Sequence, residues 1–147
     1  MHDEFMRLAV ALAEEAQADG EVPVGALVVL DDRVVGRGRN ATIAQNDPTA
    51  HAEMLAIREA CARVGNYRLD GATLYSTLEP CVMCAGALVA ARVATLVFAA
   101  RDLRFGGVRS KFRLADSDIL NHRVEVVEGV LAVDSMRLLQ NFFGTRR

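Results

Sequence analysis

The sequence contains no long uninterrupted hydrophobic segment. Its longest apolar run, from Cys81 to Ala91, has 11 residues and ends at Arg92. Because a helix needs roughly 20 apolar residues to cross a bilayer, this run predicts a buried helix, and we expect no membrane partner. The first four residues are acidic on balance and lack the basic start and cleavage pattern of a secretion signal. These absences predict a cytoplasmic protein.

Cysteine is scarce and odd in number, with only Cys61, Cys81 and Cys84. In a chain without a secretion signal, three cysteines argue against a disulfide framework and favour metal binding or catalysis. Cys61 shares the apolar face of a predicted helix with Ile57 and Val64, which predicts a small buried side chain. The chemical role therefore falls to Cys81 and Cys84.

Lysine is almost absent, because 16 of the 17 basic residues are Arg and only Lys111 is Lys. Arginine suits planar recognition of phosphates and bases, although codon bias explains the same count. The net charge of −2 conceals an asymmetry: residues 1–60 hold 5 basic and 11 acidic side chains, and residues 61–147 hold 12 and 8. Five of the basic residues lie between Arg101 and Arg113, a stretch that is by default a solvated loop.

No linker, repeat or low-complexity tract divides the chain, so we expect a single domain over residues 1–147. The apolar fraction of 52% is ordinary for a globular protein. Helical and alternating spacings of apolar residues predict the following elements. Helices are expected over 5–16, 51–64, 81–91 and 131–143, and strands over 24–30, 33–38, 73–77, 95–99 and 124–127. Asp47 is a candidate N-cap for the second helix, and 101–122 is expected to be a surface loop with room for a short helix. This alternation favours an α/β sheet covered on both faces, with a hairpin at its beginning.

The most informative residues are His51-Ala52-Glu53 and, after 26 intervening residues, the run from Pro80 to Cys84. Cys81 and Cys84 are three residues apart on one predicted helical turn and can hold one ion with both sulfurs. The imidazole of His51 supplies a third ligand. Two thiolates and one imidazole suit zinc, and the start of a helix favours the thiolate form.

Glu53 decides what such a site does. Three protein ligands leave one tetrahedral position for water, which is the arrangement of a catalytic zinc site. If Glu53 were the fourth ligand, the site would be closed and structural. If Glu53 stood beside the water, it could take and return protons. The spacing alone leaves both open.

The pattern His-Ala-Glu followed by Pro-Cys-x-x-Cys resembles the signature of the cytidine and adenosine deaminase superfamily. Further blocks resemble the TadA-type tRNA adenosine deaminases over nearly the whole chain. These blocks are Glu21–Gly25, Asn40, Asp47–Glu53, Asn66–Leu69, Thr77–Cys81, Ala100–Asp102 and Asn121–Arg123. The chain departs from that family around Leu103-Arg104-Phe105 and from Val108 to Asp118, and it ends at Arg147 where many relatives continue with a basic tail.

The resemblance implies an α/β fold in which three layers form an αβα sandwich around a mixed, mostly five-stranded sheet. It also implies a homodimer with one zinc ion per subunit, held by His51, Cys81 and Cys84, and a catalytic role for Glu53 in proton transfer. The expected substrate is a tRNA anticodon stem-loop, whose wobble adenosine is converted to inosine. The residues expected to bind it are Asn40, Pro23, Val24, Ala52, Asp102, His122, Arg146 and Arg147.

Several of these residues have a simpler interpretation. Asp102 could accept a hydrogen bond from a ribose 2′-hydroxyl, or it could pair with Arg101 or Arg104. His122 could contact RNA or merely position a loop, and Phe142-Phe143 could pack in the core or stack on a base.

Two other functions compete with tRNA deamination. One is deamination of a free base or nucleoside, such as guanine or cytidine, by the same zinc machinery. The other is a noncatalytic zinc module in which Glu53 is the fourth ligand.

Overall fold

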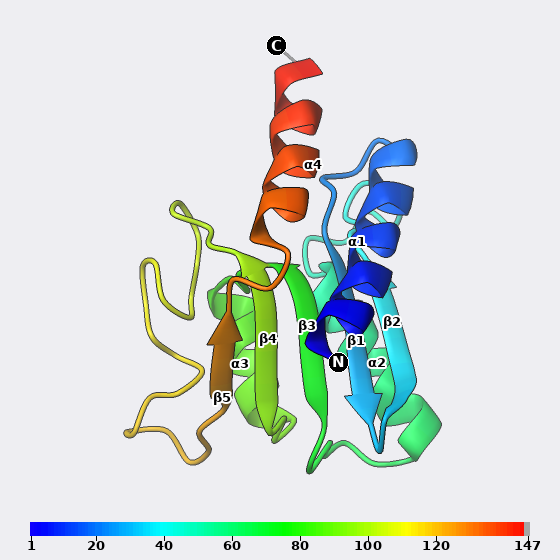
Figure 1. The fold of residues 1–147 in the computed structure, drawn as a ribbon. Helices are drawn as coiled ribbons and strands as arrows, with labels where there is room; N and C mark the ends of the chain where they lie inside the picture. The colour runs from blue at the N-terminus through cyan, green and yellow to red at the C-terminus, as the bar shows by residue number, and fades with distance from the viewer. Residues whose placement is uncertain (146–147) are drawn as a thin grey trace.

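The fold was analysed in a computed structural model that describes residues 1–145. It consists of four helices and five strands (Figure 1). The helices are α1 (His2–Ala18), α2 (Ala52–Val64), α3 (Val82–Ala90) and α4 (Ala132–Thr145). The strands are β1 (Gly25–Leu30), β2 (Arg33–Arg39), β3 (Thr73–Leu78), β4 (Thr95–Ala100) and β5 (Glu125–Glu128). No helix among the described residues is both long and apolar enough to cross a membrane.

The strands form one mixed sheet in the order β2-β1-β3-β4-β5. β1 runs antiparallel to both β2 and β3, whereas β3, β4 and β5 are mutually parallel. The β1–β2 hairpin turns at Asp31 and Asp32, whose φ angles of 51° and 60° are those of a tight turn that matches the twist of the strands. The parallel half places the carboxyl ends of β3 and β4 side by side, with Leu78 paired to Ala100.

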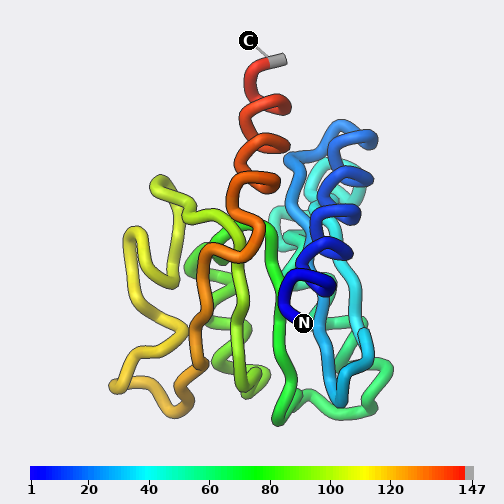
Figure 2. Tube along the Cα trace, viewed as in Figure 1, coloured from blue at the N-terminus to red at the C-terminus, as the bar shows by residue number. Residues whose placement is uncertain are grey.

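Helices cover both faces of the sheet, so the molecule has three layers (Figure 1). α1 and α4 lie on one face and α2 and α3 on the other, and the tube view shows α4 projecting beyond the carboxyl ends of β3 and β4 (Figure 2). Alternate residues of β3 serve the two cores: Leu74 packs on the α2–α3 side, and Tyr75 packs with Met6 of α1. The predicted αβα sandwich around a five-stranded sheet is thereby confirmed.

Helix α2 lies very close to β2, because glycines on the strand face small residues on the helix. A Cβ on Gly38 would lie 2.0 Å from the carbonyl oxygen of Ala52, and one on Gly36 would lie 2.2 Å from that of Ala56. Only glycine permits this approach. The contact fixes the start of α2, where His51 and Glu53 lie.

One local prediction is wrong, and a second, the surface loop over 101–122, is confirmed without the short helix for which it left room. The N-cap of α2 is His51, while Asp47 accepts hydrogen bonds from the backbone N–H and hydroxyl of Thr49 and shapes the preceding turn. The segment 101–122 contains no helix; it is a long loop beside β4 and β5, joined to the start of α3 by a bridge between Cys81 and Gly106 (Figures 1 and 2).

Candidate metal centre and active site

Two helix N-termini bring the predicted metal ligands together. His51 is the N-cap of α2 and Cys81 is the N-cap of α3, with Cys84 in the first turn of α3. Their ligand atoms lie within 4.8 Å of one another, although His51 is 30 or more positions from the two cysteines in the chain. The two helices pack side by side on the same face of the sheet, so their starts meet beyond the ends of β2 and β3.

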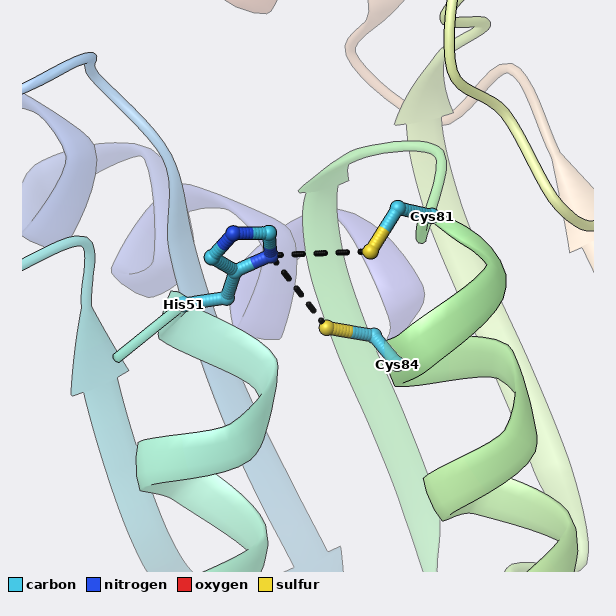
Figure 3. Close-up of side chains that lie close together, drawn as sticks. All are labelled: His51, Cys81 and Cys84. Carbon is cyan, nitrogen blue, oxygen red and sulfur yellow. Dashed lines mark hydrogen bonds between the residues drawn. The ribbon is translucent and has the colours of Figure 1, made fainter. Parts of the chain in front are cut away.

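The spacing of the donor atoms fits a tetrahedral zinc ion. Nδ1 of His51 lies 3.6 Å from Sγ of Cys81 and 3.6 Å from Sγ of Cys84 (Figure 3). With zinc–sulfur bonds of about 2.3 Å and zinc–nitrogen bonds of about 2.05 Å, tetrahedral angles give a nitrogen–sulfur separation of about 3.6 Å. The ring nitrogen that faces the sulfurs is therefore placed to coordinate through Nδ1.

The electrostatics of the thiols favour a cation. Hydrogen bonding from Cys84, with a further contribution from His51, lowers the pKa of Cys81 to about 4 despite burial. The same pair raises the pKa of Cys84, because hydrogen bonding to Cys81 and burial both hold its proton. A divalent cation would convert both groups to thiolates, since a coordinating thiol is deprotonated by the metal charge.

Glu53 lies in the first turn of α2 and is almost fully buried, with 4% of its surface exposed. Burial raises the pKa of Glu53 to about 7, against the opposing influence of its own backbone N–H and of His51. The metal-capable group found among residues 1–145 consists of His51, Cys81 and Cys84 and does not include Glu53. The carboxyl group of Glu53 thus lies beside the three candidate metal ligands, and its raised pKa suits proton exchange near neutral pH.

A pocket of about 750 Å³ opens over these residues, and its floor contains His51, Glu53 and Cys81. Four predicted substrate-binding residues line it, and three of them, Asn40, Val24 and Ala52, lie close to the start of α2 or to the ends of the hairpin strands. Asn40 follows β2 directly, is 9% exposed, and donates its backbone N–H to the carbonyl oxygen of Val24. The start of α2 and the ends of the hairpin strands therefore form one side of the pocket.

The opposite wall is the loop from Arg101 to Phe112, here called the wall loop. Asp102, also expected to bind substrate, lines the pocket here together with Arg104, Phe105 and Lys111. Oδ1 of Asp102 accepts the backbone N–H groups of Arg104 and Phe105, so neither predicted ion pair forms. Arg101 pairs instead with Glu128, at 2.7 Å.

The basic residues of this region differ in their availability. Arg109 and Arg113 pair with Asp116, at 3.0 and 3.5 Å, and Arg101 is held by Glu128. Within residues 1–145, no ion pair involves Arg104 or Lys111, and both line the pocket. Only two of the five cations in the predicted basic stretch therefore face the pocket without a carboxylate partner.

Two predicted contact residues with described positions, Pro23 and His122, do not line the pocket. Pro23 is buried next to Val24 but does not line the cavity, because the neighbouring residues present their side chains instead. Nε2 of His122 lies 2.7 Å from the carbonyl oxygen of Val93, before the start of β4, which is the end of the sheet opposite the metal group. That contact matches the interpretation in which His122 positions a loop. Arg146 and Arg147 lie outside the described residues.

Sequence reasoning missed part of the pocket. Phe142 is buried, as expected for core packing, whereas Phe143 is 54% exposed and lines the cavity with Leu139. Glu79 also lines the pocket, and in the sequence it stands out only as part of the block Thr77–Cys81. The donors to its carboxylate lie more than 20 residues further along the chain, so no local spacing could reveal them.

Comparisons with known proteins agree with this geometry. Residues 1–100 match the family model for the cytidine and deoxycytidylate deaminase zinc-binding region. A tRNA-specific adenosine deaminase of Haemophilus influenzae is 48% identical over 146 residues, covering 99% of this chain and 84% of the relative. A solved structure from a study of A-to-I editing by tRNA:A34 deaminases at the wobble position of transfer RNA superposes with a TM-score of 0.89 and 44% identity, covering 92% of this chain and 99% of the other. A guanine deaminase from Nitrosomonas europaea matches with a TM-score of 0.83 and 26% identity over 97% of this chain and 84% of that one.

The three-layer α/β fold and the His-Cys-Cys group at two helix starts place this chain among the α/β proteins with a zinc site. Within that class, the chain belongs to the cytidine and deoxycytidylate deaminase zinc-binding family. The cofactor is therefore zinc, and the chain is a deaminase. This assignment replaces the alternative of a noncatalytic zinc module.

Proposed function

We propose that this protein hydrolyses adenosine to inosine at the wobble position of a tRNA anticodon, with release of ammonia. The observation that carries the proposal is the tetrahedral spacing of three ligand atoms, two of which belong to residues that line a pocket together with the buried carboxyl group of Glu53. The identity of 48% to a tRNA-specific adenosine deaminase over nearly the whole chain supports the RNA substrate.

In this proposal His51, Cys81 and Cys84 hold the ion. Bound zinc supplies a Lewis acid that makes water nucleophilic near neutral pH. Glu53 takes a proton from the attacking water and delivers it to the adenine ring nitrogen. Glu53 then takes the remaining proton from the new hydroxyl group on C6 and passes it to the leaving amine, so that the carbon–nitrogen bond breaks, ammonia leaves and the carbonyl group of inosine forms. One carbon–oxygen bond forms and one carbon–nitrogen bond breaks, so no oxidant is needed.

The adenine is held by the side of the pocket opposite the wall loop. The side-chain amide of Asn40 can donate to and accept from the edge of a purine, and its place directly after β2 directs it to the pocket. Val24 and Ala52 supply apolar surface against the base. Pro23 acts only through Val24.

The rest of the RNA passes over the wall loop. Arg104 and Lys111 supply positive charge to phosphates, and Asp102 offers an oxygen to a ribose 2′-hydroxyl. Arg146 and Arg147 add charge at the end of the chain, and His122 contributes only by ordering its loop.

Deamination of a free base is the second candidate, favoured by the structural likeness to a guanine deaminase. That protein is 26% identical to this chain, compared with 44% for the protein from the tRNA study. The available cations on the wall loop also suit a polyanion better than an uncharged base. We therefore place RNA first.

The family resemblance further supports a homodimer whose two copies jointly shape the RNA groove, in a chain that forms a single domain and acts in the cytoplasm. Sedimentation of the zinc-loaded protein tests the dimer: a mass of one chain at micromolar concentration would contradict it.

The deciding experiment is incubation of zinc-loaded protein with total tRNA, followed by sequencing of adenosine-to-inosine changes. We expect inosine at position 34 of a small set of tRNAs. Parallel reactions with adenosine, guanine and cytidine test the rival. Turnover of one of these without any tRNA product would replace tRNA deamination with free-base deamination.

A further inference from the structure

Glu79 is a buried carboxylate between β3 and the metal ligands. It follows Leu78, the last residue of β3, and precedes Cys81 by two positions. Only 2% of its surface is exposed. Ionised groups are rarely buried without a compensating partner, and none of the ion pairs within residues 1–145 involves Glu79.

Hydrogen bonds from the wall loop satisfy this carboxylate. Oε2 accepts the backbone N–H groups of Val108, Arg109 and Ser110, at 3.1, 2.7 and 2.9 Å. Oε1 accepts the backbone N–H of Asp102 at 3.1 Å and the hydroxyl of Ser110. Four backbone donors and one hydroxyl, spread over nine residues of an irregular loop, thus converge on one side chain.

The same loop is pressed against the start of α3 at two glycines. A Cβ on Gly106 would lie 2.3 Å from Oε2 of Glu79, and one on Gly107 would lie 2.8 Å from the backbone nitrogen of Val82. Gly107 also donates its N–H to the carbonyl oxygen of Pro80 at 2.8 Å. The loop therefore rests directly on the segment that carries Cys81.

Between its anchored ends the wall loop carries the side chains that face the pocket. Asp102, Arg104 and Phe105 line the cavity. Leu103 and Phe105 are 72% and 66% exposed, so packing against the rest of the chain does little to hold this part. The position of these side chains relative to the metal ligands depends on the anchored backbone.

We infer that Glu79 is a positioning residue for substrate recognition: its carboxylate holds the wall loop at a fixed distance from the zinc ligands. The inference rests on the proposed function, since the substrate it positions is the RNA. Glu79 touches no reacting atom and leaves the chemical step to Glu53.

Glu79→Gln tests the inference with little change in side-chain volume. A glutamine side chain has one acceptor oxygen and one NH₂ group, so one of the two sets of donors loses its partner. We expect the KM for an anticodon stem-loop RNA to rise about tenfold, because at least one buried N–H group of the wall loop then faces an NH₂ group in place of an acceptor. The value of kcat should change by less than about threefold, as for an interaction made equally in the ground and transition states.

Two measurements distinguish this positioning role from a general structural role. Zinc content should stay at the wild-type value, and hydrogen exchange should accelerate at the amides of Asp102 and of residues 108–110 while β3 remains protected. Gly106→Ala disturbs the same contact from the loop side and should reproduce the rise in KM. Gly86→Ala, at a helical glycine where a Cβ meets nothing within 4 Å, is the matched control and should leave KM unchanged.

Each outcome bears on the inference. A KM within twofold of wild type, or loss of zinc from Glu79→Gln, overturns it. If Glu79→Gln does not fold, Ser110→Ala removes a single hydrogen bond, and an unchanged KM in that variant overturns it as well. If the wild-type protein itself fails to deaminate the RNA, the proposed function is wrong and the inference falls with it.

Discussion

At the scale of single residues, His51 and Glu53 have different roles although they are only two positions apart in the chain. His51 caps α2 and faces the two sulfurs, while Glu53, two positions later, lies in the same turn with its carboxyl group buried. A carboxyl group with a pKa of about 7 can both accept and release a proton at neutral pH. Ligand and proton carrier are therefore held by one helical turn.

Glu53→Ala should retain zinc and fold but lose deamination, because the proposed role is proton transfer and the three ligands are untouched. We expect the rate on stem-loop RNA to fall by at least about a hundredfold. Zinc analysis and circular dichroism check that the site and fold survive. A rate near that of wild type would sink the proposed chemistry.

Asp102→Asn separates the two roles of that side chain. An asparagine can still accept the N–H groups of Arg104 and Phe105, so the turn should persist. If Asp102 also accepts a ribose 2′-hydroxyl, loss of its charge should narrow the preference for RNA over single-stranded DNA. Rates on matched RNA and DNA stem-loops measure this. An unaltered ratio would leave Asp102 with the turn alone.

The chemically specific residues were predictable because short motifs carry them. The zinc ligands and the position of Glu53 followed from two spacings and a resemblance, and Asn40 from a matching position. For His122 the sequence left RNA contact and loop positioning open, since a matching block says nothing about which end of the sheet the block occupies. Glu79 could not be found from spacing, because its partners lie on a loop without periodicity.

At the scale of elements, the contact between β2 and α2 sets the position of the metal ligand His51. Gly38 faces the carbonyl oxygen of Ala52, the first residue of α2. Backbone cannot yield as a flexible side chain can, so any Cβ there must push the helix away from the sheet.

Gly38→Ala should therefore destabilise the protein by roughly 1–3 kcal/mol or more and weaken zinc binding. Urea unfolding and zinc titration measure the two effects. Gly86→Ala serves as the control, and there the greater helix propensity of alanine should raise stability by up to about 1 kcal/mol. Equal stabilities of the two variants would show that α2 can shift without cost.

Periodicity predicted every helix and strand, with ends that differ from the structure by a few residues. The N-cap of α2 was wrong because Asp47 engages Thr49 within a turn of its own. The segment 101–122 has no apolar period, and its order comes from contacts with Glu79 and from the Arg109–Asp116 pair. Such tertiary contacts are invisible to local patterns.

At the scale of the whole molecule, the ion joins two helices that otherwise make few contacts with each other. α2 and α3 both pack mainly on the sheet, and their starts meet at the zinc ligands. A ligand that binds only the folded state stabilises it, so zinc contributes to the stability of the entire fold.

Removal of zinc by a chelator should lower the melting temperature by at least about 5 °C, and added zinc should restore it. Differential scanning calorimetry measures the change. Cys84→Ala lacks one of the three ligands and should show low zinc content and no response to the chelator. A chelator response equal to that of wild type in this variant would remove Cys84 from the metal site.

The end of β4 separates the part of the chain that carries the zinc ligands from the part that carries the wall loop. The family model ends at residue 100, and every zinc ligand, Glu53 and Asn40 lie before it, whereas the wall loop and α4, with Phe143, come after it. We expect that grafting residues 101–145 would change the contacts with the part of the substrate outside the base, because Asn40, Val24 and Ala52, proposed to hold the base, also lie before residue 100. Any grafted loop must also preserve the hydrogen bonds to Glu79, so it needs backbone N–H groups placed to donate to that carboxylate. Chimeras designed to keep these donors offer a route to deaminases with new RNA targets.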